Sequence, residues 1–104
     1  MFIQFVKFKS GLSEDQARQV MEERAPQFRA LPGLLQKYYV CDTQTGEYAG
    51  IYVWDSEESM NEFRQSELAK SIPMAYQAQG QPRIELLDVL MPLRERALEP
   101  ASAD

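Results

Sequence analysis

The sequence predicts a single α+β domain whose elements follow the order β-α-β-β-α-β. Three observations lead to this prediction. The chain has 104 residues, a length that suits one domain. Runs rich in β-branched and aromatic residues alternate with segments that carry apolar residues at helical spacing. Hydrophobic residues make up 44 % and charged residues 26 %, as in chains that fold around a core. The element order is that of the ferredoxin-like fold, in which four antiparallel strands carry both helices on one face.

The first part of the chain predicts a strand followed by a helix. Residues 2–8 are rich in aromatic and β-branched side chains and favour a strand. Residues 13–16, SEDQ, match a capping box, and apolar residues then recur at helical spacing. Pro26 lies inside this pattern and cannot donate to the helical ladder, so we expect the helix to kink or break near Ala25.

The middle of the chain predicts a hairpin followed by a second helix. Residues 34–41 and 47–54 are strand-like runs, and the turn-forming residues between them predict an antiparallel pair. Asp55 or Ser56 can then cap a helix whose first turn is acidic.

The remaining segments complete the predicted domain. Residues 66–79 favour another short helical piece, and the Gly and Pro of residues 80–82 are expected to end it. Residues 83–91 predict the last strand. We therefore expect a domain over residues 1–92 and a mostly polar C-terminal tail over residues 93–104.

The predicted strands are apolar on both sides. In the third strand, Tyr52 and Trp54 alternate with Ile51 and Val53. Two helices can cover only one face of the sheet, and soluble monomers rarely expose a large apolar patch. A second copy packed sheet against sheet would cover the other face, so we expect a homodimer.

Charge and composition exclude several classes of partner. The net charge is −5 and basic residues are not clustered, which argues against binding nucleic acid or an anionic membrane. No apolar run approaches the ~18 residues of a transmembrane helix, so no membrane partner is expected. Cys41 is alone and the first residues do not resemble a signal peptide, so we expect a cytoplasmic protein. Histidine is absent, which removes the usual general base and the commonest metal and haem ligand, and we expect no metal or cofactor.

Residues 52–58, YVWDSEE, stand directly before a predicted helix and carry a family resemblance. Together with the Leu-Pro-Gly segment before the hairpin, the element order and the two-sided strands, they resemble the dimeric α+β barrel superfamily. The closest similarity is to the YdhR-like mono-oxygenases and the antibiotic biosynthesis monooxygenases. The resemblance covers roughly residues 2–92. It implies that Trp54 faces a cavity between sheet and helices. An asparagine often accompanies this tryptophan, and Gln4 stands at its place here.

The resemblance implies cofactor-free oxygenation of a small hydrophobic aromatic molecule, such as a quinol or an anthrone. Gln4 and Trp54 are the candidate catalytic residues. The candidate substrate-binding residues are Tyr39, Gly50, Tyr52 and Tyr76. The haem-degrading branch of the superfamily has a histidine about where this chain has Pro73, so haem degradation is not expected.

Two points of this hypothesis stay open in the sequence. The hairpin register decides whether Tyr38 or Tyr39 shares a face with Trp54, and a short loop favours Tyr39. The general base would have to be Lys37, Asp88, a tyrosine or solvent. Lys37 by itself is more typical of a solvated charge at a strand edge.

Two other interpretations compete with the enzyme. One is a non-catalytic dimeric barrel that binds a small hydrophobic ligand or a protein partner, motivated by the same aromatic residues and the missing histidine. The other is purely structural, with Trp54 and Gln4 as satisfied core residues and no cavity. Enzymatic activity is therefore not decided by the sequence.

Overall fold

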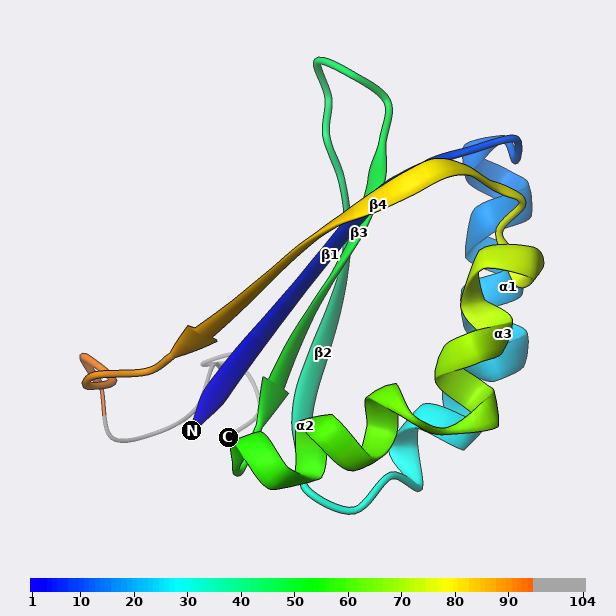
Figure 1. Cartoon of the computed structure of the whole chain (residues 1–104). Helices are drawn as coiled ribbons and strands as arrows, with labels where there is room; N and C mark the ends of the chain where they lie inside the picture. Colours follow the sequence, from blue (N-terminus) through cyan, green and yellow to red (C-terminus); the bar gives the residue numbers. More distant parts are fainter. Residues whose placement is uncertain (95–104) are drawn as a thin grey trace, which may run out of the picture.

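The computed structural model describes residues 1–94, so residues 95–104 of the predicted tail lie outside the described part of the chain. The elements in chain order are β1 (Phe2–Ser10), α1 (Glu14–Arg29), β2 (Leu34–Cys41), β3 (Tyr48–Trp54), α2 (Glu57–Arg64), α3 (Glu67–Ala75) and β4 (Ala78–Asp88). The strands form one antiparallel sheet in the order β2-β3-β1-β4, and the helices lie on one side of it (Figure 1). The predicted ferredoxin-like fold is confirmed, with α2 and α3 as the two helical pieces before the last strand.

Serine side chains define the start of each helix. Ser13 accepts a hydrogen bond from the backbone N–H of Gln16 at 3.3 Å, and the Gln16 side chain accepts one from the N–H of Ser13 at 2.9 Å. This is the predicted capping box. Ser56 and Ser66 cap α2 and α3 in the same way, each accepting the N–H of the residue three positions later. None of the helices within residues 1–94 has the length and apolar character needed to cross a membrane.

The expected break near Ala25 is wrong. Helix α1 continues through Pro26 to Arg29. Pro26 lies in the last turn, so its missing N–H removes one hydrogen bond close to the helix end. Phe28, the next-to-last residue of α1, is buried in the core and holds this turn against the sheet.

The predicted bounds of the last strand are also wrong, because β4 begins five residues earlier than residue 83 and ends at Asp88. Gly80 and Pro82 lie within the strand. β4 is an edge strand, where a proline need not donate to a neighbour, and its register with β1 shifts between Lys7 and Lys9. Gly80 has a φ of +72° beside this irregularity.

The core fills the space between the sheet and the helices. It consists of two adjoining clusters of buried side chains. The first contains Phe28, Tyr52, Trp54, Met60 and Phe63, and the second contains Phe8, Ala17, Tyr48 and Tyr76. Five of these nine residues come from strands β1 and β3 or from the turn before β4, and the others come from the helices. Because all of them lie between the sheet and the helices, this face of the sheet is better covered than the opposite one.

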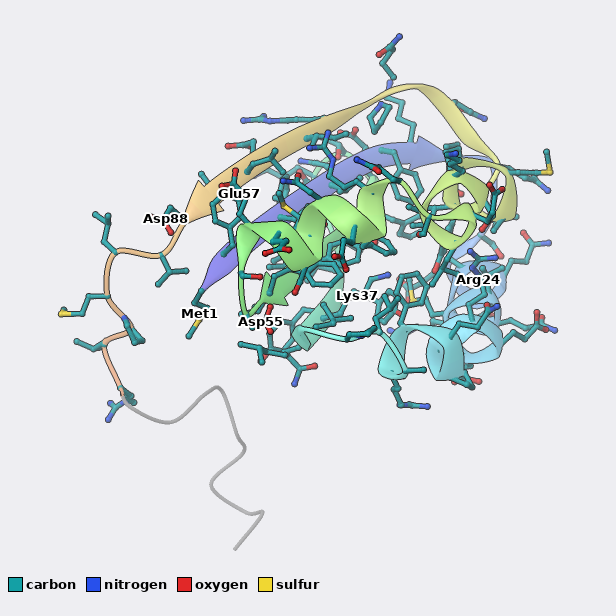
Figure 2. All side chains as sticks on the ribbon, turned by 60° about the horizontal axis from the view of Figure 1, so that its bottom comes forward. Met1, Arg24, Lys37, Asp55, Glu57 and Asp88 are labelled. Carbon is teal, nitrogen blue, oxygen red and sulfur yellow. The ribbon has the colours of Figure 1, made fainter. Side chains whose placement is uncertain are left out.

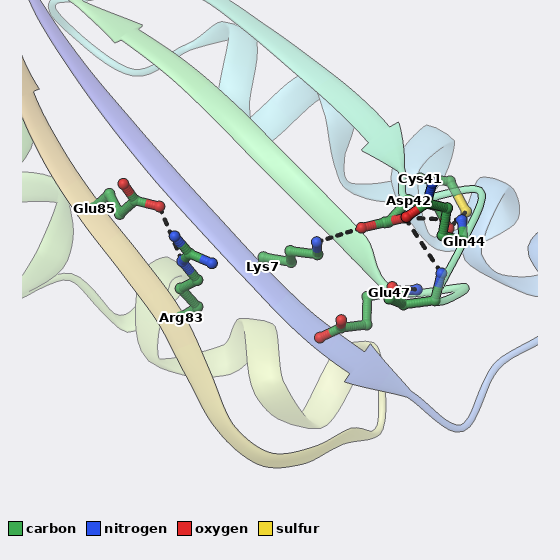
Figure 3. A network of polar contacts seen from close by, with 8 residues as sticks. Lys7, Cys41, Asp42, Gln44, Glu47, Arg83 and Glu85 are labelled. Atoms are coloured by element: carbon green, nitrogen blue, oxygen red, sulfur yellow. Dashed lines mark hydrogen bonds and ion pairs between the residues drawn. The ribbon is translucent and has the colours of Figure 1, made fainter.

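The opposite face of the sheet carries polar interactions at one end. Lys7 forms an ion pair with Asp42, and Arg83 pairs with Glu85 at 3.0 Å (Figure 3). The hydrogen bond from Lys7, with two backbone N–H groups of the hairpin loop, lowers the pKa of Asp42 to about 2. The register places apolar side chains, Ile3 and Val53 among them, at the other end of this face.

Candidate active site

The site residues come from the face of the sheet that packs against the helices. Antiparallel pairing places Lys37 of β2 opposite Tyr52 of β3, and Tyr52 opposite Gln4 of β1. Adjacent strands lie ~4.8 Å apart, so these three residues form one row about 10 Å long across the sheet. The neighbouring row contains Tyr39 and Gly50.

The hairpin register settles which tyrosine shares a face with Trp54. Tyr39 pairs with Gly50, whose side of β3 is also that of Tyr52 and Trp54. Tyr38 pairs with Ile51 and belongs to the opposite face. The prediction that favoured Tyr39 is confirmed.

The side chains of Trp54 and Gln4 are hydrogen-bonded to each other. The indole Nε1 of Trp54 donates a hydrogen bond to Oε1 of Gln4 at 3.0 Å. Trp54 has no exposed surface and Gln4 is 4 % exposed. The Trp54 ring lies parallel to the Tyr52 ring, with 3° between their planes and 6.1 Å between centroids. Trp54 is thus a core residue whose polar atom fixes the orientation of the Gln4 amide.

A cavity of about 350 Å³ lies between the sheet and the α2–α3 segment. Gln4 and Tyr52 line it on the sheet side, and Phe63 lines it from α2. Arg64 and Lys70 add positive charge, and no acidic residue is among the described residues that line it. Apolar walls with a few polar groups are typical of sites for small molecules. The interpretation without a cavity is therefore wrong, although it correctly describes Trp54 and Gln4 as partners. Trp54 lies outside the lining of this cavity.

A second, much smaller space of about 20 Å³ adjoins the first. The two share four lining residues, Val6, Phe8, Tyr52 and Ile72. All four predicted substrate-binding residues, Tyr39, Gly50, Tyr52 and Tyr76, line the small space. The structure thus divides the predicted site. Gln4 lines only the large cavity, Tyr52 lines both spaces, and Trp54 lines neither. The other three residues line only the small space.

Lys37 also lines the small space, and its interpretation as a solvated charge is wrong. Its Nζ lies 3.6 Å from the ring centroid of Phe28, 4.4 Å from that of Tyr39 and 4.5 Å from that of Tyr52. Burial lowers the pKa of Lys37 to about 7, and the positive charge of Arg24 acts in the same direction. Lys37 on β2 and Arg24 on α1 both lie on the helix side of the sheet (Figure 2). Strand alternation could have predicted this position, because Lys37 stands two residues from Tyr39 and therefore shares its face of β2.

The other candidate bases fit less well. Burial raises the pKa of Tyr39, raises that of Tyr76 to about 12 and raises that of Tyr52 still further. These hydroxyls therefore stay protonated at neutral pH and act as donors. Asp88 is exposed at the end of β4 and lines neither space.

Gly50 leaves room for its neighbours. A Cβ at this position would lie 3.0 Å from Cε1 of Tyr52 and 3.4 Å from Cε of Lys37. Tyr52 is 3 % exposed and packed on Trp54, so it cannot easily move aside. We expect Gly50→Ala to lower the free energy of unfolding by about 1–2 kcal/mol, the overpacking cost less the entropic gain of alanine. Denaturant unfolding measures this difference.

The matched control is Gly11→Ala. The added Cβ there would approach the end of the flexible Gln77 side chain at 3.0 Å, which can move away. We expect a change within about 0.5 kcal/mol. Equal effects of the two substitutions would contradict a crowded Gly50 site.

Residues 3–80 match the sequence model of the family described as "Putative mono-oxygenase ydhR". The chain belongs to this family. The matched segment includes the row formed by Gln4, Tyr52 and Lys37, helices α1 to α3 and the start of β4. The sequence matches no curated protein.

Solved structures show the same fold at low sequence identity. A putative antibiotic biosynthesis monooxygenase from Deinococcus radiodurans has a TM-score of 0.70 and 16 % identity, over 93 % of this chain and 100 % of that one. SnoaB from Streptomyces nogalater, a cofactor-independent oxygenase, has a TM-score of 0.69 and 16 % identity, over 90 % and 98 % of the two chains. A dimeric ferredoxin-like protein of unknown function from Thermobifida fusca has a TM-score of 0.65 and 14 % identity, over 86 % and 92 %.

Proposed function

We propose that this member of the ydhR family is a mono-oxygenase that oxidises a small, electron-rich aromatic molecule of the quinol or anthrone type with dioxygen and no bound cofactor. The observation that carries the proposal is the cavity of about 350 Å³ with the amide of Gln4 in its wall. Family membership and the fold shared with the cofactor-independent oxygenase SnoaB support it. A cavity of this size suits a ligand of a few fused rings.

In the proposed reaction the substrate supplies its own electrons. Loss of a proton from an acidic hydroxyl or from the anthrone CH₂ leaves an anion that can reduce dioxygen. The ring carbon forms a bond to one oxygen atom, the O–O bond breaks, and the second oxygen atom leaves as water. The product is a quinone, and the substrate has lost two hydrogens and gained one oxygen. The protein must bind the ring, exclude water and stabilise the anion.

Gln4 is suited to stabilising that anion. Its Oε1 accepts the hydrogen bond from Trp54, so the amide orientation is set and the Nε2–H₂ donors remain for a ligand. Gln4 would donate to the negative charge that develops at the end of the ring system in the large cavity, and Trp54 would act as a positioning residue. The Tyr52 ring would form the apolar wall beside the substrate. The small space lined by Tyr39, Gly50 and Tyr76 would take the polar end of the substrate.

Oxygen consumption tests the function. Purified protein is expected to consume dioxygen with at least one member of a panel of quinols, naphthols and anthrones, with one oxygen atom of ¹⁸O₂ appearing in the quinone product. Protein-free reactions under the same conditions provide the background. If ligands bind tightly across the panel and dioxygen uptake never exceeds that background, the protein is a binding protein and the proposal fails.

We further propose that the protein is a homodimer whose subunits meet through the faces of the sheets that carry no helix. Strand β4 exposes leucines on both sides, with Leu86 39 % and Leu87 49 % exposed. The register places Leu87 beside Ile3, and Ile3 beside Val53, in one apolar row on the uncovered face. A second copy would remove this surface from water. The protein from Thermobifida fusca that shares this fold is dimeric, which supports a dimer.

A charge on the uncovered face is expected to separate the subunits. Wild-type protein should have twice the mass of one chain in light scattering at micromolar concentration. Val53→Lys should shift it to the monomer mass, because burying an unpaired lysine in an apolar interface costs several kcal/mol. Met74→Lys is the control, since Met74 lies on α3 and is 87 % exposed. A monodisperse wild-type monomer would overturn the dimer.

A further inference from the structure

The amine of Lys37 lies among three aromatic rings, and it has no acidic partner within the part of the chain that the structure describes. Its Nζ lies within 4.5 Å of the ring centroids of Phe28, Tyr39 and Tyr52. Among residues 1–94, Lys37 takes part in no ion pair. A lysine held at a strand edge for solubility would extend into water. This one lies under α1, where desolvation disfavours its charged form.

Among the charged and titratable groups around Lys37, one cation favours the neutral amine and three tyrosines stay uncharged. Arg24 faces it from α1 and adds a like charge. Arg24 is held in place, because its Nη2 donates to Ser71 Oγ of α3 at 2.6 Å. Tyr39 of β2, Tyr52 of β3 and Tyr76 at the end of α3 interact electrostatically with one another near this point, and burial keeps all three protonated.

The small space brings the amine to the edge of the substrate cavity. Lys37 lines the space of about 20 Å³, which shares the side chains of Val6, Tyr52 and Ile72 with the cavity of about 350 Å³. A space needs roughly 10–15 Å³ to hold one water, so this one accepts a single oxygen atom. For a proton transfer to Lys37, a hydroxyl on a ring in the large cavity must pass these shared side chains and reach Nζ. Lys37 and Gln4 would then lie at opposite ends of the row that Tyr52 bridges.

We propose that Lys37 is the general base of the site, and that the substrate is an aromatic molecule with an acidic phenolic or enolic hydroxyl which enters the small space and gives its proton to the Lys37 amine. The proton moves from the hydroxyl oxygen to Nζ. The products of this step are an aromatic anion and an ammonium ion next to each other. The inference rests on the proposed oxygenation, which needs such an anion.

The surroundings of Lys37 suit this role better than those of an exposed lysine. An ordinary lysine amine is protonated at neutral pH and cannot accept a proton, whereas the pKa of about 7 leaves much of the Lys37 amine neutral. After the transfer, the new ammonium ion lies over three aromatic rings and beside the new anion. Both interactions stabilise it. Arg64 and Lys70 at the large cavity also favour an acidic substrate over a cationic one.

Dioxygen uptake with a naphthol or anthrone is the first test. In the wild-type protein kcat/KM is expected to rise with pH through about 7, because only the neutral amine accepts the proton. Lys37→Met should lower kcat/KM by about 100-fold or more and lose this rise. Lys9→Met, at an exposed position of β1, is the matched control and should change neither quantity.

Lys37→Arg distinguishes a base from a simple positive charge. Arginine keeps the charge but stays protonated in proteins, so it cannot accept the proton. If Lys37 is the base, Lys37→Arg is about as inactive as Lys37→Met. Retained activity in either variant, or a flat wild-type profile from about pH 5 to about pH 9, would overturn the proposal. The wild-type profile needs no variant, so a variant that fails to fold still leaves a decisive result.

A binding measurement separates this inference from the oxygenation itself. The probe is 4-nitrophenol, whose neutral and ionised forms absorb at different wavelengths. Bound to the wild-type protein, it is expected to ionise at least about one pH unit below its value in water, and bound to Lys37→Met it should not. If the wild-type protein consumes no dioxygen but ionises the probe through Lys37, only the oxygenation fails. If it consumes dioxygen and Lys37→Met ionises the probe equally well, Lys37 is not the base.

Discussion

Replacing Trp54 by alanine is expected to lower the free energy of unfolding by about 3–5 kcal/mol. Trp54 has no exposed surface and packs against Tyr52 and Phe63 in the core. The substitution removes these contacts, opens a cavity and leaves Gln4 without its indole donor. Domains of this size are stable by only about 5–15 kcal/mol, so the loss is a large part of the total.

Denaturant unfolding followed by circular dichroism measures this effect, at one fixed protein concentration because dimerisation would contribute to stability. Met74→Ala is the control for removing an apolar side chain, since Met74 is 87 % exposed, and its effect should stay within about 0.5 kcal/mol. A loss below about 1 kcal/mol for Trp54→Ala would show that the region around Trp54 collapses easily or is already loosely packed.

After the substitutions of Lys37, removing the amide of Gln4 is expected to have the largest effect on turnover. Gln4→Leu takes away the Nε2–H₂ donors at the large cavity, and kcat/KM for dioxygen uptake should fall by about 100-fold, as when one oxyanion donor is lost. It should also cost about 1–3 kcal/mol of stability, because the buried Nε1–H of Trp54 loses its acceptor. The two effects have different origins and can be separated.

Trp54→Phe and the double variant Trp54→Phe/Gln4→Leu separate them. Both lack the hydrogen bond between positions 4 and 54, and in the double variant neither of these two positions carries a polar side chain. The double variant should therefore be at least as stable as Trp54→Phe, in which Oε1 of Gln4 has lost its donor, while its kcat/KM should be lower by up to about 100-fold. Equal turnover of these two proteins would mean that Gln4 acts only through packing with Trp54.

The sequence by itself determined the order of elements and the faces of the strands. Caps such as Ser13 and the alternation of Tyr52 and Trp54 are local features, and they predicted helix starts and the helix face of β3 correctly. The residues expected at the site, Gln4 and Tyr39 among them, followed from strand alternation and a family resemblance. Apart from the resemblance, these inferences depend on residues within a few positions of one another.

Only the tertiary structure decided the bounds of β4, the roles of Gln4 and Trp54 toward each other, and the burial of Lys37. Gly80 and Pro82 are acceptable in β4 because it lies at a sheet edge, which strand order and not local sequence determines. Lys37 is partly buried because α1 places Phe28 over it and Arg24 near it. The pKa of an amine depends on everything packed around it, and for Lys37 those groups come from one helix and two strands that only the folded chain brings together.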